Sequence, residues 1–381
     1  VDAARARLDR RHLHGPRARF DALELTVFSQ GVAMLAEEMG GLLERSSISP
    51  NIRERRDASC ALFDADGRMV AQAAHIPVHL GAMPESVAAV RACGAAPGDV
   101  FLLNDPSHGG SHLPDLTMVE VIADAHDAQR IIGYAAVRAH HADVGGMSPG
   151  SMPFGATELF QEGLIVPPVR IERGGVAQDD VMRLVLANVR TPEEREGDLR
   201  AQRAACAAGR AGWQALYARL GADVLGDAVN ALLDYTERRV RARLELLEGA
   251  EGRAADALEG DGVSDAAIPV VIHVRVKDAT LHLDLTGTSP AVRGNVNAPP
   301  AVARAAAVFV LPSWAWSAER IWAWHHVDPG DHGVTIGAAL LGEEGRTAFV
   351  GLSRNWSSRS GPAYAVAVDL ETGAWRQLGA A

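Results

Sequence analysis

Two short segments, residues 104–115 and 138–146, concentrate the side chains that could do chemistry. Each contains the spacing His-x-x-Asp beside a glycine-rich turn. Together they supply six potential metal ligands, namely Asp105, His112, Asp115, His140, His141 and Asp143. Imidazole with carboxylate suits Zn, Mn or Fe(II), and several carboxylates around an octahedral ion favour Mn. The spacing therefore indicates a divalent metal site, although His-x-x-Asp is not a specific signature and Asp before Pro is an ordinary turn former.

His140 and His141 are adjacent, and neighbouring side chains of an extended chain point to opposite faces. One of the two could hold a metal while the other positions substrate or transfers a proton. The pattern G-x-S-x-G occurs at residues 146–150, but within a stretch rich in Gly, Pro and Ser that predicts a loop instead of a strand-to-helix elbow, and no Cys has a His nearby in sequence. A serine or cysteine hydrolase is therefore a poor fit.

Two weaker signals lie upstream. Arg53 and Arg56 belong to a charged run over 51–57, which could bind an anion or be a solvated surface. His79 and Glu85 stand near the expected start of a short helix, where capping or packing is the ordinary role. We carry these four residues as candidate substrate-binding residues.

The elements that would position these segments can be predicted from periodicity and turn signals. Apolar residues at three- and four-residue steps predict a helix over 22–45, and Asp-x-Asp-Gly between apolar runs predicts a hairpin of 59–63 with 68–72. Further strands are expected at 100–103, 116–122, 131–138, 269–275 and 281–286, and helices from 84 to 94 and over 298–311. The stretch 178–247 reads as almost entirely helical. The fold class is therefore α+β, with antiparallel strands carrying the site loops and a helical segment around 178–247.

Composition excludes several classes. The formal net charge of −11 over 381 residues argues against nucleic acid as a partner, because phosphate binding needs a positive footprint. Cys60, Cys93 and Cys206 lie far apart, which argues against a disulfide scaffold and fits the cytoplasm. The sequence has no apolar run long enough to cross a membrane. Lys277 is the only lysine and lacks phosphate-loop glycines, so this chain does not bind ATP by that route.

Composition changes near residue 312. Six of the seven tryptophans fall after this point, at positions 314, 316, 322, 324, 356 and 375. Trp-rich runs usually form core or interface anchors. We therefore expect two regions, residues 1–311 and a divergent Trp-rich tail over 312–381.

The motifs, taken together, resemble the hydantoinase B / 5-oxoprolinase family, which includes the B components of N-methylhydantoinases and is related to acetone carboxylase alpha subunits. They occur in family order over roughly residues 20–311. The matching segments are 49–64, 76–86, 104–115, 138–146, 149–153, 162–167 and 284–299. Family members continue after the position of Leu311 with a second half that this sequence lacks.

The resemblance implies one component of an ATP-dependent cyclic-amide hydrolase, acting on 5-oxoproline or a hydantoin. An A-type subunit would bind ATP and phosphorylate the substrate carbonyl, so the enzyme would be a cytoplasmic hetero-oligomer. This B-type chain would carry Mn or Zn through His112, Asp115, His140 and Asp143, with catalytic roles for His141 and Asp105. Two alternatives stay open. One is a truncated, non-catalytic assembly subunit, and the other is the alpha-type subunit of an ATP-dependent ketone carboxylase.

Overall fold

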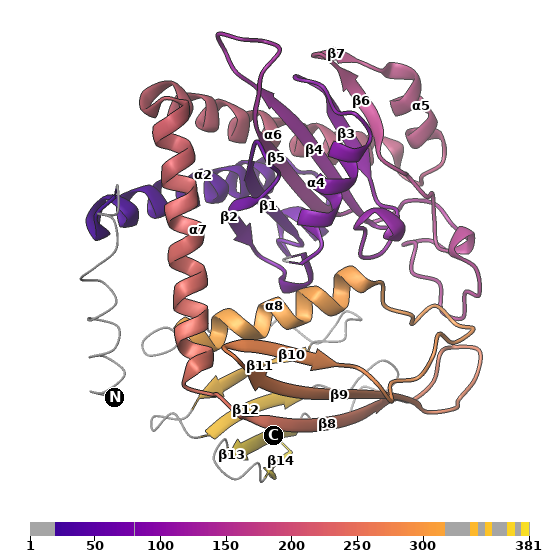
Figure 1. Ribbon diagram of the computed structural model, residues 1–381. Coiled ribbons are helices and arrows are strands. Elements are labelled where there is room, and N and C mark those ends of the chain that lie inside the picture. The colour runs from indigo at the N-terminus through magenta and orange to yellow at the C-terminus, as the bar shows by residue number, and fades with distance from the viewer. Residues whose placement is uncertain are drawn as a thin grey trace. The chain divides into compact units, whose positions relative to one another are not determined.

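The computed structural model describes residues 20–79 and 81–316, together with four later strands (Figure 1). The chain forms two compact units. One contains most of the chain up to Arg238 together with Ala257–Pro269 and Ser289–Ala306. The other contains Arg239–Asp256, Val270–Thr288 and the chain from Ala307 onward.

The first unit is built on a seven-stranded antiparallel sheet with the order β2-β1-β5-β4-β3-β6-β7. Its strands are β1 (Ala58–Asp64), β2 (Met69–Ala74), β3 (Val100–Leu103), β4 (Asp115–Ala123), β5 (Ile131–His140), β6 (Val169–Arg173) and β7 (Val176–Ala177). The predicted hairpin is present between β1 and β2. The Asp64 carboxylate closes its turn by accepting hydrogen bonds from the backbone of Asp66 and Arg68.

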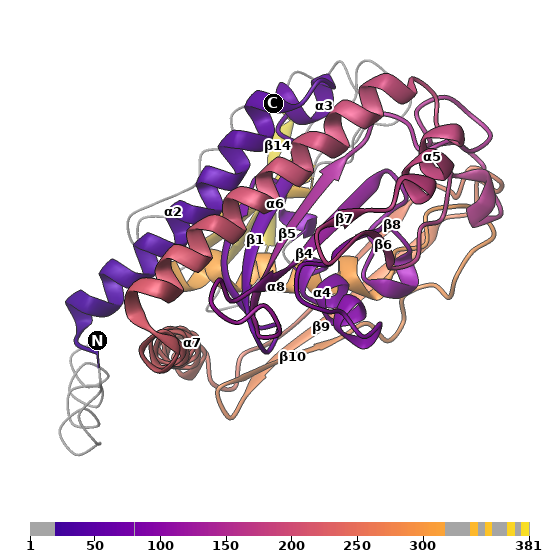
Figure 2. The ribbon, with the colours of Figure 1, turned by 90° about the horizontal axis from the view of Figure 1, so that it is seen from above.

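Helices cover both faces of this sheet. Helices α2 (Ala22–Ser46) and α6 (Pro192–Leu220) lie side by side on one face (Figure 2), where they pack into the larger hydrophobic core. Helix α4 (Met83–Ala92) covers the other face with a smaller core. Helix α2 begins with a capping box in which Asp21 and Glu24 bond each other's backbone amides. The sheet is therefore buried on both sides, and its loops and strand ends are the places left for a site.

The remaining elements of the first unit are short or extend beyond it. They are α3 (Pro50–Arg53), α5 (Asp179–Ala187), α7 (Ala222–Glu245), α8 (Pro300–Trp316) and the 3₁₀ turns η1 (Pro77–His79), η2 (Pro106–His108) and η3 (Leu159–Gln161). Helices α5, α6 and α7 make up the predicted helical segment at 178–247. The α+β class and the helical segment are both confirmed.

The second unit contains two smaller sheets. One has the order β10-β9-β8, formed by β8 (Glu251–Leu258), β9 (Ile268–Lys277) and β10 (Thr280–Asp284). The other has the order β11-β12-β13-β14, formed by Ile336–Leu341, Thr347–Leu352, Tyr364–Asp369 and Trp375–Ala380. Trp322, Trp324 and Trp356 lie outside the described residues, and the predicted boundary at 311 stays a prediction. Within the described part of the chain, every helix is too short or too polar to cross a bilayer.

Candidate metal centre

The candidate ligands lie where two neighbouring strands reach the same edge of the sheet. In the antiparallel register of β4 and β5, Asp115 is paired with His140, and Thr117 with Arg138. On its other side, β5 pairs Arg138 with Ser59 of β1. Side chains alternate along a strand, so these residues share the face that α4 covers. The same face continues inward with apolar side chains, among them Ala61, Val119, Val121, Tyr134 and Ala136.

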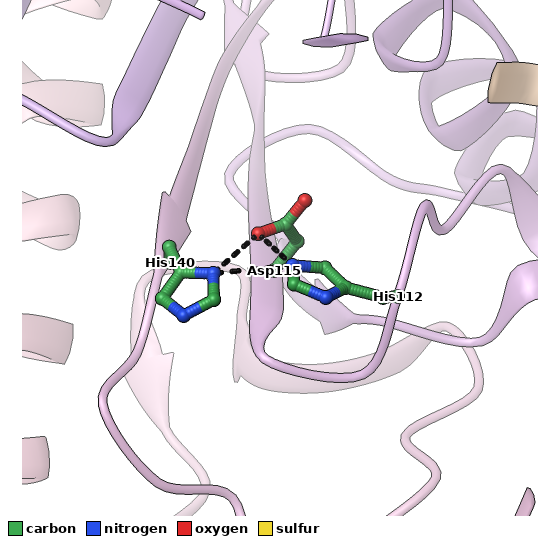
Figure 3. A group of neighbouring side chains, drawn as sticks. All are labelled: His112, Asp115 and His140. Atoms are coloured by element: carbon green, nitrogen blue, oxygen red, sulfur yellow. Dashed lines mark hydrogen bonds and ion pairs between the residues drawn. The ribbon is translucent and has the colours of Figure 1, made fainter. Parts of the chain in front are cut away.

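Three donor atoms converge at this edge (Figure 3). His112 Nε2 lies 2.7 Å from Asp115 Oδ1 and 3.1 Å from His140 Nδ1. His140 Nδ1 lies 3.3 Å from the same Asp115 oxygen. An octahedral ion with bonds of about 2.1 Å separates neighbouring ligand atoms by about 3.0 Å. Donor type and spacing therefore both fit a divalent cation, and these three residues form a group that could hold one.

The loop that carries His112 is held by a buried asparagine. The Asn104 side-chain amide donates to the carbonyls of Leu113 and Leu164, at 2.7 and 2.9 Å. Its oxygen accepts from the Val166 amide at 2.7 Å. Gly110 lies so close that an added Cβ would come within 2.0 Å of the Asn104 carbonyl oxygen. The Asn-Asp-Pro motif therefore fixes the path of the loop as well as forming its first turn.

Both oxygens of Asp115 are engaged. One faces the two imidazoles described above, and the other accepts a hydrogen bond from the Ser111 hydroxyl. His79 Nε2 lies 3.3 Å from that second oxygen without the alignment of a hydrogen bond, and His79 Nδ1 lies 2.9 Å from Ser59 Oγ. His79, a predicted substrate-binding residue, is thus fully buried beside Asp115.

Asp57 is a residue of this edge that the sequence analysis did not single out as a ligand. Its Oδ2 lies 3.8 Å from His140 Nδ1. Burial and the negative charge of Asp115 both raise the pKa of the Asp57 carboxyl. In the sequence, the signal that could have pointed to Asp57 is its position directly before the strand β1. In the structure, its backbone carbonyl accepts a hydrogen bond from the His140 amide at 2.9 Å. A cation between the two carboxylates would relieve their repulsion.

The charges of the group favour an ionised carboxylate at its centre. Burial of Asp115 would raise its pKa, but the positive charge and hydrogen bond of His112, together with the side-chain contacts of His140 and His79, hold it well below the usual value. Burial of His112 would lower its pKa, but Asp115 raises it overall. Asp115 is therefore ready to bind a cation without first losing a proton.

A sequence model of the hydantoinase B/oxoprolinase family matches residues 21–319. The chain belongs to this family. 5-Oxoprolinase 1 of Arabidopsis thaliana is 36% identical over 324 residues, covering 76% of this chain and 25% of the relative. A Pseudomonas protein named as the B component of a D-/L-hydantoinase is 30% identical over 292 residues, covering 74% of this chain and 49% of the relative. The chain thus spans about a quarter of one relative and about half of the other.

Two solved structures of larger proteins are similar to this family member. The ATP-dependent caprolactamase from Pseudomonas jessenii superposes with a TM-score of 0.71 at 28% identity, covering 77% of this chain and 51% of the other. Nucleotide-free acetone carboxylase superposes with a TM-score of 0.70 at 17% identity, covering 76% and 40%. The second likeness concerns the fold alone.

Asp143 does not join the donor group in this hydantoinase B/oxoprolinase chain. Its carboxylate accepts from the backbone amides of Gly145, Gly150 and Arg190, at 2.8, 3.0 and 3.0 Å. It also pairs with the Arg190 guanidinium at 3.0 Å. Burial would raise its pKa, but these bonds lower it overall. Asp143 therefore anchors the glycine loop that follows it.

We expect Asp143→Asn to leave Mn²⁺ binding unchanged and to loosen the loop at 145–150. Asparagine keeps the size of the side chain but loses the charge that Arg190 pairs with and one acceptor oxygen. A Mn²⁺ titration followed by electron paramagnetic resonance checks the first effect, and amide hydrogen exchange checks the second. If this variant failed to bind Mn²⁺, Asp143 would be a metal ligand, as the sequence analysis predicts.

The predicted catalytic residues have structural partners. His141 is fully buried, and its Nε2 lies 2.8 Å from the Gln202 side-chain oxygen in α6. Burial lowers its pKa to about 4, so the ring is neutral. Asp105 caps the turn η2 by accepting from the Ser107 amide and contacts His108 Nδ1 at 2.8 Å. The adjacent histidines do point apart as predicted, but the catalytic roles of His141 and Asp105 stay predictions.

The other predicted substrate-binding residues lie in different surroundings. Arg53 is exposed on α3, and Arg56 is exposed and pairs with Glu44 at 3.1 Å. Glu85, in the first turn of α4, pairs with Arg304 of α8. Their predicted roles toward substrate stay predictions.

Proposed function

We propose that this chain is the metal-bearing B-type component of an ATP-dependent cyclic-amide hydrolase. The observation that carries the proposal is the group of donor atoms from His112, Asp115 and His140, with mutual distances of 2.7 to 3.3 Å. Membership of the hydantoinase B/oxoprolinase family supports the reaction class. The likeness to a 5-oxoprolinase and to a caprolactamase supports a cyclic amide as substrate.

The ligands that we propose are His112, Asp115 and His140, with Asp57 as a fourth. A divalent ion held there would supply Lewis-acid polarisation of a carbonyl oxygen. The donor set mixes imidazole with carboxylate, which suits Zn or Mn. We include Asp57 because its carboxylate lies 3.8 Å from His140 Nδ1 and close enough to the Asp115 carboxylate to be repelled by it.

The chain's own residues orient this group and define its open side. The Asp115 side chain is 3% exposed and forms the floor, whereas those of His112 and Asp57 are 36% and 31% exposed. Substrate therefore approaches from the side of His112 and Asp57. The Ser111 hydroxyl donates a hydrogen bond to the far oxygen of Asp115, and the buried His79 ring packs beside that oxygen, so the near oxygen keeps a fixed direction. Fixed donors reduce the reorganisation needed when a substrate carbonyl arrives.

ATP would be bound by an A-type partner subunit. The single lysine, Lys277, has no phosphate-loop glycines around it. An amide resists attack because of its resonance, and phosphorylation of its oxygen by the partner would remove that protection. This division of labour places the activation step on the A-type subunit and the metal-dependent step on this chain.

The test is reconstitution with an A-type subunit. The two chains should copurify, this chain should hold about one equivalent of Mn or Zn, and ring opening of 5-oxoproline, hydantoin or caprolactam should require ATP. The metal content is measured by mass spectrometry, and the ring-opened product and ADP by chromatography. A complex that copurifies without metal and without activity would favour an assembly role instead. Carboxylation of a ketone would favour the carboxylase alternative.

A further inference from the structure

A completely buried arginine lies in the residue pair next to the candidate metal donors on the same face of strands β4 and β5. Arg138 is two residues before His140 on β5, so its side chain points to the same face of the sheet. It is paired with Thr117 on one side and Ser59 on the other. Its exposed fraction is 0%. Burying a guanidinium is costly unless its donors are bonded, so the contacts that it makes need an explanation.

The contacts of Arg138 are directed at neutral acceptors on three different segments. Its Nε donates to Thr117 Oγ1 at 2.7 Å. Its Nη2 donates to Ser86 Oγ at 2.9 Å and to the carbonyl oxygen of Gly109 at 2.7 Å. Among the described residues, no carboxylate oxygen forms a close ion pair with it, and its Nη1 has no hydrogen-bond partner. This is not the arrangement of an ordinary buried ion pair.

The Gly109 contact reaches the loop that carries the metal donors. Gly109 has a φ of +86°, and an added Cβ would lie 2.5 Å from the Ser86 amide nitrogen, so the loop is seated directly on α4. The Ser86 hydroxyl also bonds the Gly109 carbonyl, at 3.2 Å. Two residues later, Ser111 bonds Asp115, and His112 follows it. A shift of Gly109 would therefore displace both side chains.

We propose that Arg138 is a positioning residue that fixes the metal-ligand loop over residues 109–115 against β4 and α4. This inference rests on the proposed function, because it assumes that His112 and Asp115 bind a metal. The fork of the guanidinium is essential to the role, since one nitrogen holds Thr117 on the sheet while another holds Gly109 on the loop. A lysine ammonium is a point donor and cannot span both directions from the same stem.

The test measures metal affinity separately from stability, in the full chain. We expect Arg138→Met and Arg138→Lys each to weaken Mn²⁺ binding by about 10- to 100-fold, which is typical of residues that orient metal ligands. The absorption spectrum of bound Co²⁺ should also change, because its bands report ligand geometry. Wild-type affinity in Arg138→Lys would overturn the inference, since charge without the fork would then suffice.

Arg195→Met is the matched control. Arg195 is 2% exposed and lies on α6, where it contacts Asp198. We expect this variant to unfold at lower urea concentration and to keep wild-type Mn²⁺ affinity and the wild-type Co²⁺ spectrum. An equal loss of affinity in this variant would show that burial of any arginine is enough, and would overturn the inference.

Thr117→Val covers the case in which the Arg138 variants do not fold. Valine keeps the shape of threonine but removes the acceptor of Nε, so the guanidinium loses one anchor. We expect Mn²⁺ binding to weaken measurably, and unchanged affinity would overturn the inference. A wild-type chain that holds no Mn²⁺ or Zn²⁺ would overturn the proposed function itself. If the wild-type chain binds Mn²⁺ and Thr117→Val binds it equally well, only the positioning role of Arg138 would be overturned.

Discussion

Asp115→Asn should abolish most metal binding, with Mn²⁺ affinity at least about 100-fold weaker than in the wild-type chain. The expected loss exceeds that for Arg138, which only orients the proposed ligands, because this change removes the charge of a proposed ligand itself. Asparagine has the same shape, so the contact with Ser111 can persist. ATP-dependent ring opening by the reconstituted complex should fall with the metal content. Isothermal titration with Mn²⁺ and metal analysis of the purified complex are the measurements.

Asp99→Asn is the control for this change. Asp99 is also a buried carboxylate, and its oxygens accept from Ala96, Gly174 and Arg170, at 3.1, 3.0 and 2.7 Å. Its substitution should lower stability without altering Mn²⁺ affinity. If Asp115→Asn kept wild-type affinity, the group of His112, Asp115 and His140 would not be the metal site.

Gly110→Ala should both destabilise the fold and weaken metal binding. The new Cβ would lie 2.0 Å from the carbonyl oxygen of Asn104, and a backbone atom held by a buried residue cannot move aside cheaply. Overpacking of this kind costs about 1–3 kcal/mol of unfolding free energy. The loop would have to shift, carrying His112 with it. Urea denaturation followed by circular dichroism measures the first effect, and Mn²⁺ titration measures the second.

Gly31→Ala shows what the same methyl group does where space is available. Gly31 lies in α2, and nothing is within 4 Å of the added Cβ. Alanine favours a helix over glycine by about 1 kcal/mol, so stability should rise or stay the same and metal binding should not change. A Gly110→Ala chain as stable as Gly31→Ala would mean that the loop accommodates a side chain freely.

The sequence was sufficient for the parts of the site that are local or set by strand ends. His112 and Asp115 are three residues apart in one turn, and His140 lies two residues beyond the strand predicted at 131–138. The hairpin of β1 and β2 also follows from its turn residues. These features depend on neighbours in the chain, which periodicity and turn chemistry describe directly.

The features that the sequence analysis missed depend on distant partners. Asp57 lies near the group only because the strand order places β1 beside β5, and no single segment of the sequence specifies that order. The surroundings of Asp143 are set by Arg190, which lies 47 residues away along the chain. His79 contacts Asp115 because the loop after β2 folds back onto β1, where it meets Ser59. Spacing within a motif could not distinguish a ligand from an anchor in these cases.

The alternation of side chains along β4 and β5 also limits how this protein can change length during evolution. The turn at residues 124–130 joins the two strands far from the donors, so insertions there leave the register intact. Deleting one residue inside β5 would turn His140 toward α2 and α6 and bring a neighbouring residue to the metal side. Homologous chains should therefore vary in length at the turn and keep a constant number of residues from Arg138 to His140. The donor group that we propose as the metal site would tolerate only changes that preserve this count.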